Sequence, residues 1–77
     1  MPINENDLIR ARIIISGFFK HRRELAGISV SVIAEKTGYN IVTIENFEKG
    51  RFYPDLKFIL TMCHALNLSP FFVPKDE

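Results

Sequence analysis

Cysteine is nearly absent from this sequence, which contains a single one, Cys63. A disulfide within the chain is therefore impossible. The N-terminal residues also lack the basic start and the apolar stretch of a signal peptide. The longest unbroken apolar clusters, among them residues 13–15 and 71–73, are far shorter than the roughly 20 residues that cross a membrane. Together these absences predict a cytoplasmic protein without a transmembrane helix.

An excess of charge of one sign is also lacking. Lysine and arginine together number 10 and aspartate and glutamate 9, so the formal net charge is +1. This balance neither favours nor excludes nucleic acid as a partner, and a prediction of DNA binding must rest on where the charges sit. Because the chain has only 77 residues and shows no linker or repeat, residues 1–77 are predicted to form a single domain.

Residues that carry catalytic or metal chemistry are few. His21, Cys63 and His64 are the only candidates for metal binding or nucleophilic catalysis, and their spacing forms no ligand set. The sequence shows no glycine-rich phosphate loop and no paired acid and base. It therefore predicts no enzyme, no metal site and no cofactor.

Turn signals divide the chain into short predicted helices, and no segment alternates for long enough to predict a strand. The predicted helices cover about residues 7–26, 30–37, 41–49, 55–66 and 70–73. The expected N-caps are Asn6 or Asp7, Ser29, Asn40 and Ser69, and Pro54 and Asp55 mark the entry to the fourth helix. Glycines expected to end the first three helices are Gly27, Gly38 and Gly50.

Helical periodicity predicts which side chains face the core. The expected buried faces are Ile15, Phe19 and Ala26; Ile33 and Ala34; Ile44, Phe47 and Glu48; and Leu56, Ile59, Leu60, Cys63 and Leu66. The first helix then has surplus apolar residues, Leu8, Ile14 and Phe18, outside its buried face. Two interpretations stay open for them: a self-association surface, or an N-terminal extension that folds back over the bundle.

Residues 29–49 form a helix-turn-helix unit, in which Ala34 is small at the helix contact and Gly38 turns the chain. From about residue 15 to residue 72, the chain resembles the Cro and lambda-repressor type helix-turn-helix domains, also called XRE-like. The resemblance is carried by Arg23, GIS at 27–29, IAEKTGY at 33–39, TIENFEKG at 43–50, Pro54 and ALNLS at 65–69. It implies an all-α fold, a compact five-helix bundle of the lambda-repressor-like DNA-binding type.

The resemblance also implies an ion pair between Arg23 and Glu48, buried between the first and third helices. Helical spacing supports it, because Glu48 shares a face with Ile44 and Phe47, where a carboxylate needs a cation. Two separate surface charges are the alternative.

A role in regulating transcription follows from the resemblance, with double-stranded DNA as the partner and a homodimer on a two-fold symmetric operator. The residues that it implies at base edges in the major groove are Asn40, Ile41, Val42, Thr43 and Asn46. Those that it implies at phosphates are Ser29, Val30, Ser31, Thr37, Lys49 and Arg51, with Lys20 and Arg22 at the rim. Candidates for the dimer contact are Leu8, Ile14, Phe18 and Phe71.

The predicted recognition helix departs from the family pattern. Val30, Ile41 and Val42 are aliphatic where the family usually has polar residues, and Glu45 is an acid where it has a small polar residue. An aliphatic side chain can pack on a thymine methyl group but cannot make a two-point hydrogen bond to a base. The apolar residues Val30, Val32, Ile41, Val42, Phe52 and Tyr53 therefore also suggest an alternative, a protein-interaction module that uses this face for a partner chain.

Overall fold

The fold is all-α, as the sequence predicts. The structure, a computed structural model, describes residues 2–69. Within them the helices are α1 (Glu5–Leu25), α2 (Val30–Thr37), α3 (Ile41–Glu48) and α4 (Leu56–Ala65). Four helices are thus found where five were expected, and the predicted fifth, at residues 70–73, lies outside the described residues.

Every helix begins at a residue whose side chain accepts a hydrogen bond from the backbone of the first turn. For α2 and α3 these residues are the expected Ser29 and Asn40. For α4 the cap is Asp55, which the sequence predicted only as part of the entry to that helix. For α1 the expectation of Asn6 or Asp7 is wrong, because the cap is Asn4. Its Oδ1 accepts from the N–H of Asp7 at 2.9 Å, while the Asp7 carboxylate accepts from the N–H of Asn4 at 3.4 Å. In this capping box Asp7 acts from inside the first turn.

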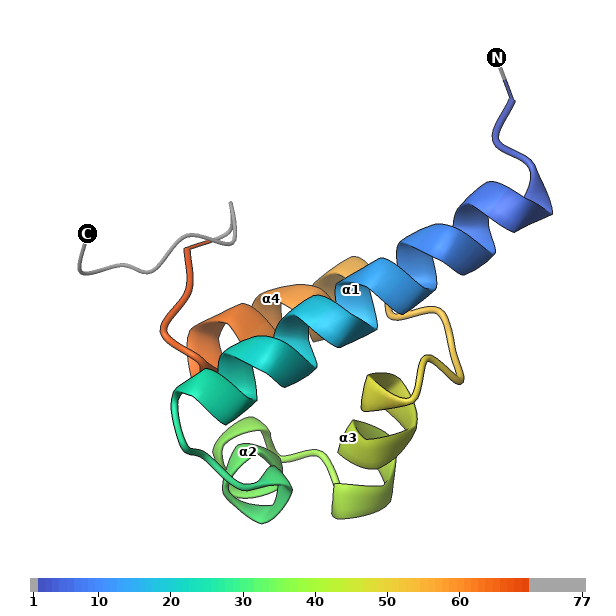
Figure 1. Ribbon diagram of the computed structural model, residues 1–77. Coiled ribbons are helices and arrows are strands. Elements are labelled where there is room, and N and C mark those ends of the chain that lie inside the picture. Colours follow the sequence, from blue (N-terminus) through green and yellow to red (C-terminus); the bar gives the residue numbers. More distant parts are fainter. Residues whose placement is uncertain (1, 70–77) are drawn as a thin grey trace.

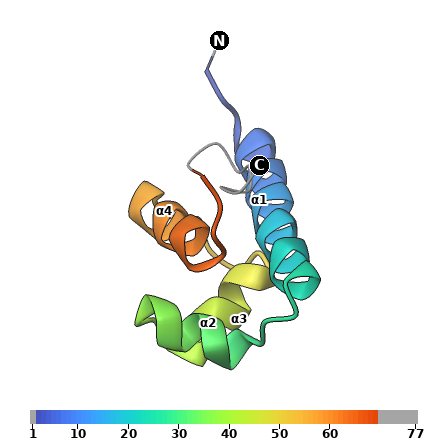
Figure 2. The ribbon, with the colours of Figure 1, turned by 90° about the vertical axis from the view of Figure 1, so that its left-hand side faces the viewer.

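The longest helix, α1, crosses the molecule and continues beyond the other helices at its N-terminal end (Figure 1). The interpretation that the N-terminal residues fold back over the bundle is therefore wrong. Leu8 and Ile14 stay 45% and 69% exposed. In Figure 2, α1 and α4 form two sides of the molecule, and α2 and α3 lie together below them.

The core lies between all four helices and is rich in aromatic rings. Its fully buried side chains are Phe19, Ile33, Ile44, Phe47, Met62 and Leu68. Phe58 of α4 contacts three other rings, at centroid distances of 4.8 Å to Phe47, 4.8 Å to Tyr39 and 5.5 Å to Phe52. Phe47 also lies 5.8 Å from Phe19. This ring cluster fixes how α4 is rotated about its axis.

The expected buried face of α4 is partly wrong. Leu56 is 71% exposed and Leu60 40% exposed, whereas Phe58 and Met62 are buried. The polar residues Lys57, Thr61 and His64 share one side of α4 at helical spacing, and Leu56 and Leu60 border that side, so they stay exposed while Phe58 packs into the core on the other side. Ala26 is also exposed rather than buried, because it is the C-cap of α1 and lies past its last turn. None of the helices in residues 2–69 combines the length and apolar composition needed to cross a membrane.

Candidate nucleic-acid interface

A tight turn sets the angle between α2 and α3. Gly38 adopts the left-handed conformation, with φ of 80°, and its N–H donates to the Ala34 carbonyl at 2.9 Å. The Thr37 hydroxyl donates to the Ile33 carbonyl at 2.8 Å and accepts from the N–H of Tyr39 at 3.2 Å. Thr37, expected at a phosphate, therefore already uses its hydroxyl inside the turn.

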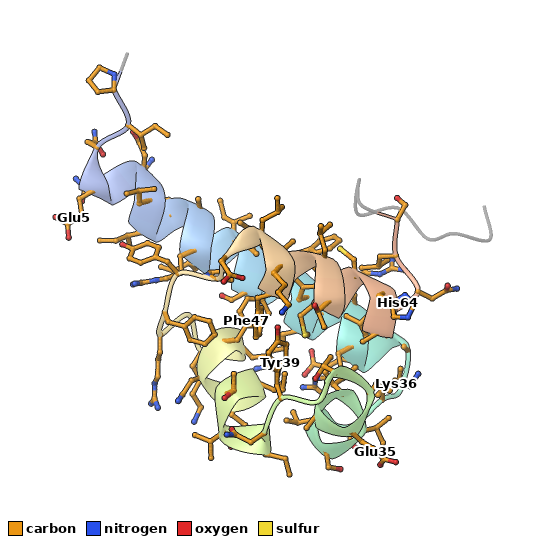
Figure 3. The ribbon with its side chains drawn as sticks, turned by 180° about the vertical axis from the view of Figure 1, so that it is seen from behind. Glu5, Glu35, Lys36, Tyr39, Phe47 and His64 are labelled. Carbon is orange, nitrogen blue, oxygen red and sulfur yellow. The ribbon has the colours of Figure 1, made fainter. Side chains whose placement is uncertain are left out.

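Aromatic packing holds the turn from the inside. Tyr39, the residue after Gly38, stacks its ring on Phe58. In Figure 3, Tyr39 and Phe47 point into the bundle, whereas Glu35 on α2 points away from it. The turn is thus fixed both by backbone hydrogen bonds and by the core, which makes α2 and α3 one rigid unit.

The first turn of α3 presents its side chains to solvent. Ile41 is 44% exposed and Val42 is 62% exposed. Asn40 Oδ1 accepts from both the N–H and the hydroxyl of Thr43, at 2.8 and 2.9 Å. The amide NH₂ of Asn40 remains as a hydrogen-bond donor. Of the predicted base-contacting residues, Asn40, Ile41 and Val42 are exposed, whereas Thr43 and Asn46 are partly buried.

Asn46 and Arg51 are joined by a hydrogen bond that the sequence did not predict. Arg51 Nη1 donates to Asn46 Oδ1 at 3.1 Å. The bond connects a residue expected at a base edge to one expected at a phosphate. It leaves the amide NH₂ of Asn46 as its donor and holds Arg51 next to α3.

At the start of α2, Ser29 Oγ accepts from the N–H of Val32 at 3.2 Å and lies 3.0 Å from Ser31 Oγ. The first backbone N–H groups of a helix have no partner within the helix, and here they belong to Val30 and Ser31. The side chain of Val30 packs against the core. The backbone N–H of Val30, predicted at a phosphate, lies at the start of α2, whereas its side chain adds little to an apolar surface.

Basic residues from two helices meet beside α2. Lys20 of α1 and Lys49, just after α3, line one shallow depression together with Val30 and Glu45. Both lysines are exposed, and so is Glu45, one helical turn before Lys49. An acid here lowers the positive potential that a phosphate would experience, so this edge is only weakly basic.

Beneath this depression lies the ion pair between Arg23 and Glu48. Arg23 Nε and Nη2 donate to the two carboxylate oxygens of Glu48 at 2.6 and 2.9 Å, and Nη1 donates to the Ile28 carbonyl at 2.9 Å. The two side chains are only 13% and 6% exposed. The hydrogen bond to Glu48 raises the pKa of Arg23 above its usual value, so this arginine stays charged. The pair joins α1 to α3 and so fixes where α3 lies.

Sequence reasoning missed a second contact between α1 and the segment after α3. The guanidinium carbon of Arg12 lies 4.7 Å from the centre of the Tyr53 ring, a cation–π arrangement. Arg12 precedes Ser16, Phe19 and Arg23 at helical spacing, and this spacing was the signal available in the sequence. Phe52, expected on the surface, instead packs against the core. The contact holds the segment that carries Arg51.

A scan against protein families matches the family described as helix-turn-helix domain over residues 14–70, well over half of the chain. The chain belongs to the helix-turn-helix domain family. A solved structure described as the hypothetical transcription factor NHTF from Neisseria is similar to this helix-turn-helix domain. The TM-score is 0.75 and the identity 22%, over 99% of this chain and 86% of that one. At this identity the likeness shows the fold alone. The comparison with curated proteins found no match.

Proposed function

We propose that this helix-turn-helix domain is a sequence-specific DNA-binding regulator of transcription that places α3 in the major groove. The observation that supports this most is the rigid α2–turn–α3 unit, which exposes Ile41 and Val42 in the first turn of α3. Lys49 and Arg51 follow α3 directly, where phosphates flank a helix in the groove.

The side chains of α3 and its N-cap can make two kinds of contact with bases, apolar contacts and hydrogen bonds. Ile41 and Val42 pack on thymine methyl groups, and the amide NH₂ groups of Asn40 and Asn46 donate to base acceptors. Arg51 acts partly by positioning, because it holds the oxygen of the Asn46 amide. Such a surface favours A·T-containing half-sites and discriminates less strongly than one with bidentate arginines.

The protein acts as a homodimer in this proposal. One recognition helix reads only a few base pairs, and two copies related by a two-fold axis read half-sites about 34 Å apart, one helical turn of DNA. The operator is then a pseudo-palindrome.

Selection of bound sequences from a randomised DNA pool tests the proposal. The wild type is expected to enrich a two-fold symmetric site. Val42→Ala is expected to relax the preference at one or two A·T positions while non-specific binding stays nearly unchanged. Val32→Ala, the same chemical change at a 39%-exposed position on α2, serves as the matched control. Binding no tighter than that of a Lys49→Ala, Arg51→Ala double variant at low salt, across the whole pool, would contradict the proposal.

One observation favours a second candidate function, a protein-interaction module. Val32, Ile41 and Val42 expose aliphatic surface on neighbouring helices without a strongly basic surround. In that case the loss of Lys49 and Arg51 has little effect, whereas Val42→Asp abolishes binding of the partner chain. The Lys49→Ala, Arg51→Ala double variant and Val42→Asp therefore separate the two functions.

A further inference from the structure

The side of α1 that faces away from the core carries an apolar strip. Ile13 is 57% exposed and Ile14 is 69% exposed, and Gly17 and His21 follow them at helical spacing on the same side. The core-facing residue Phe19 lies on the opposite side of the helix, and Ile13, at one edge of the strip, borders Gly50 together with Ser16. Within residues 2–69 this strip is not covered by another helix.

Gly17, at the middle of the strip, is not explained by packing within the chain. A Cβ atom added there would meet nothing within 4 Å. Its backbone is helical, unlike that of Gly27, Gly38 and Gly50, which all have positive φ. Glycine inside a helix costs about 0.5–1 kcal/mol relative to alanine. A close approach of another backbone is a physical reason for a glycine at such a position.

Charges flank Gly17 symmetrically. Arg10 and Glu24 lie seven residues before and after it, close to two helical turns, so both share its side of α1. Both are exposed, and neither side chain has a hydrogen bond or ion pair to a described residue, while Glu24 also attracts the neighbouring Arg23 electrostatically. If a second α1 crosses at Gly17 in the antiparallel direction, Arg10 of each copy lies beside Glu24 of the other. A two-fold axis between the two Gly17 residues therefore forms two ion pairs, each between Arg10 of one copy and Glu24 of the other.

We infer that the outward face of α1 binds the same face of a second copy, with the two helices antiparallel and crossing at Gly17. The pattern of opposite charges is complementary to itself, which favours a second copy over an unrelated partner. The inference deepens the dimer part of the proposed function and rests on it. Figure 2 shows that α1 forms one side of the molecule while α2 and α3 lie below it, so the proposed contact is on a different side of the molecule from α3.

Disulfide trapping tests the crossing point. Gly17→Cys has room for its side chain within the subunit, and the native Cys63 is only 2% exposed. Two sulfurs at the crossing can bond because the Cα atoms there lie within about 7 Å of each other. Mild oxidation is expected to convert Gly17→Cys into a covalent dimer. Glu35→Cys, on the outer side of α2, is the matched control and should stay monomeric under the same conditions. Equal, slow cross-linking of both variants would overturn the inference.

Charge reversal tests the register. Sedimentation equilibrium of Arg10→Glu and of Glu24→Arg is expected to show a dimer weakened about tenfold, because each change creates two like-charge contacts. The double reversal should return the dissociation constant to within about threefold of the wild type. A monomeric wild type at tens of micromolar, single reversals without effect, or a double reversal without rescue would each overturn the inference.

Different results would contradict the DNA-binding proposal and the proposed α1 contact. If the wild type dimerises through α1 but enriches no DNA sequence, the regulatory function is wrong and the contact stands. If it enriches a symmetric operator while both single reversals dimerise normally, the function stands and the α1 contact is wrong. The two readouts therefore assign a failure to one proposal or the other.

Discussion

At the scale of single residues, the most consequential interaction is the ion pair between Arg23 and Glu48. Burial removes both groups from water, and the bidentate geometry with the further bond to the Ile28 carbonyl compensates this cost. Helical spacing could predict that Glu48 faces inward, and the family resemblance supplied its partner. The bond between Arg51 and Asn46 was not predictable in this way, because it depends on side-chain rotamers across a loop.

Removing one partner of this ion pair is expected to be costly. Arg23→Met leaves the carboxylate of Glu48 buried without its cation and should lower the free energy of unfolding by about 3–5 kcal/mol. Urea denaturation followed by circular dichroism measures the change. The double variant Arg23→Met, Glu48→Leu removes both charges and should regain more than half of the loss. Unfolding of Arg23→Met at the wild-type urea concentration would show that the pair contributes nothing.

At the scale of helices and turns, local signals determined the ends and tertiary contacts determined the faces. The observed α2 begins and ends where the sequence predicts, because Ser29 caps it and Gly38 supplies the left-handed turn. The face of α4 was predicted only in part, because Leu56 and Leu60 were counted as buried although they border the polar residues Lys57, Thr61 and His64. Its orientation depends on ring contacts with Tyr39 and Phe47, which come from other parts of the chain.

Two glycines of this chain should respond oppositely to the same substitution. Gly17→Ala is expected to raise the unfolding free energy of the isolated subunit by about 0.5–1 kcal/mol, because the helical backbone suits alanine and the space is open. Gly38→Ala should lower it by about 1–2 kcal/mol, because φ is +80° there. Thermal unfolding at low protein concentration measures both, and a stabilising Gly38→Ala would contradict the role of the turn.

At the scale of the whole molecule, the small net charge limits electrostatic attraction to DNA. With a net charge of +1, long-range steering contributes little, and affinity has to come from a few local contacts. In the proposed function, the exposed lysines Lys20 and Lys49 would supply such contacts beside an acid, Glu45. Composition gave no information about this, because the relevant charges are defined only once α1, α2 and α3 meet.

The salt dependence of DNA binding should therefore be modest and traceable to named lysines. Lys49→Ala is expected to weaken binding to all sequences and to lower the slope of log K against log salt by about one unit per subunit. Lys57→Ala makes the same change in net charge on α4, next to Leu60 and His64, and is the control. Equal slopes for the two variants in fluorescence anisotropy titrations would remove Lys49 from the interface.

Because Cys63 is buried, the rate at which a thiol reagent labels it measures how often the fold opens. It is the only cysteine of the chain and lies on α4 within the core, where a thiol reagent in solution cannot reach it. Labelling must then wait for the structure to open, and for an opening free energy of about 5 kcal/mol the rate falls roughly four orders of magnitude below that of a free thiol. Arg23→Met should label faster by the factor that its lost stability predicts. If α1 pairs with a second copy, raising the protein concentration should slow the labelling of the wild type, because the dimer must first dissociate before Cys63 opens.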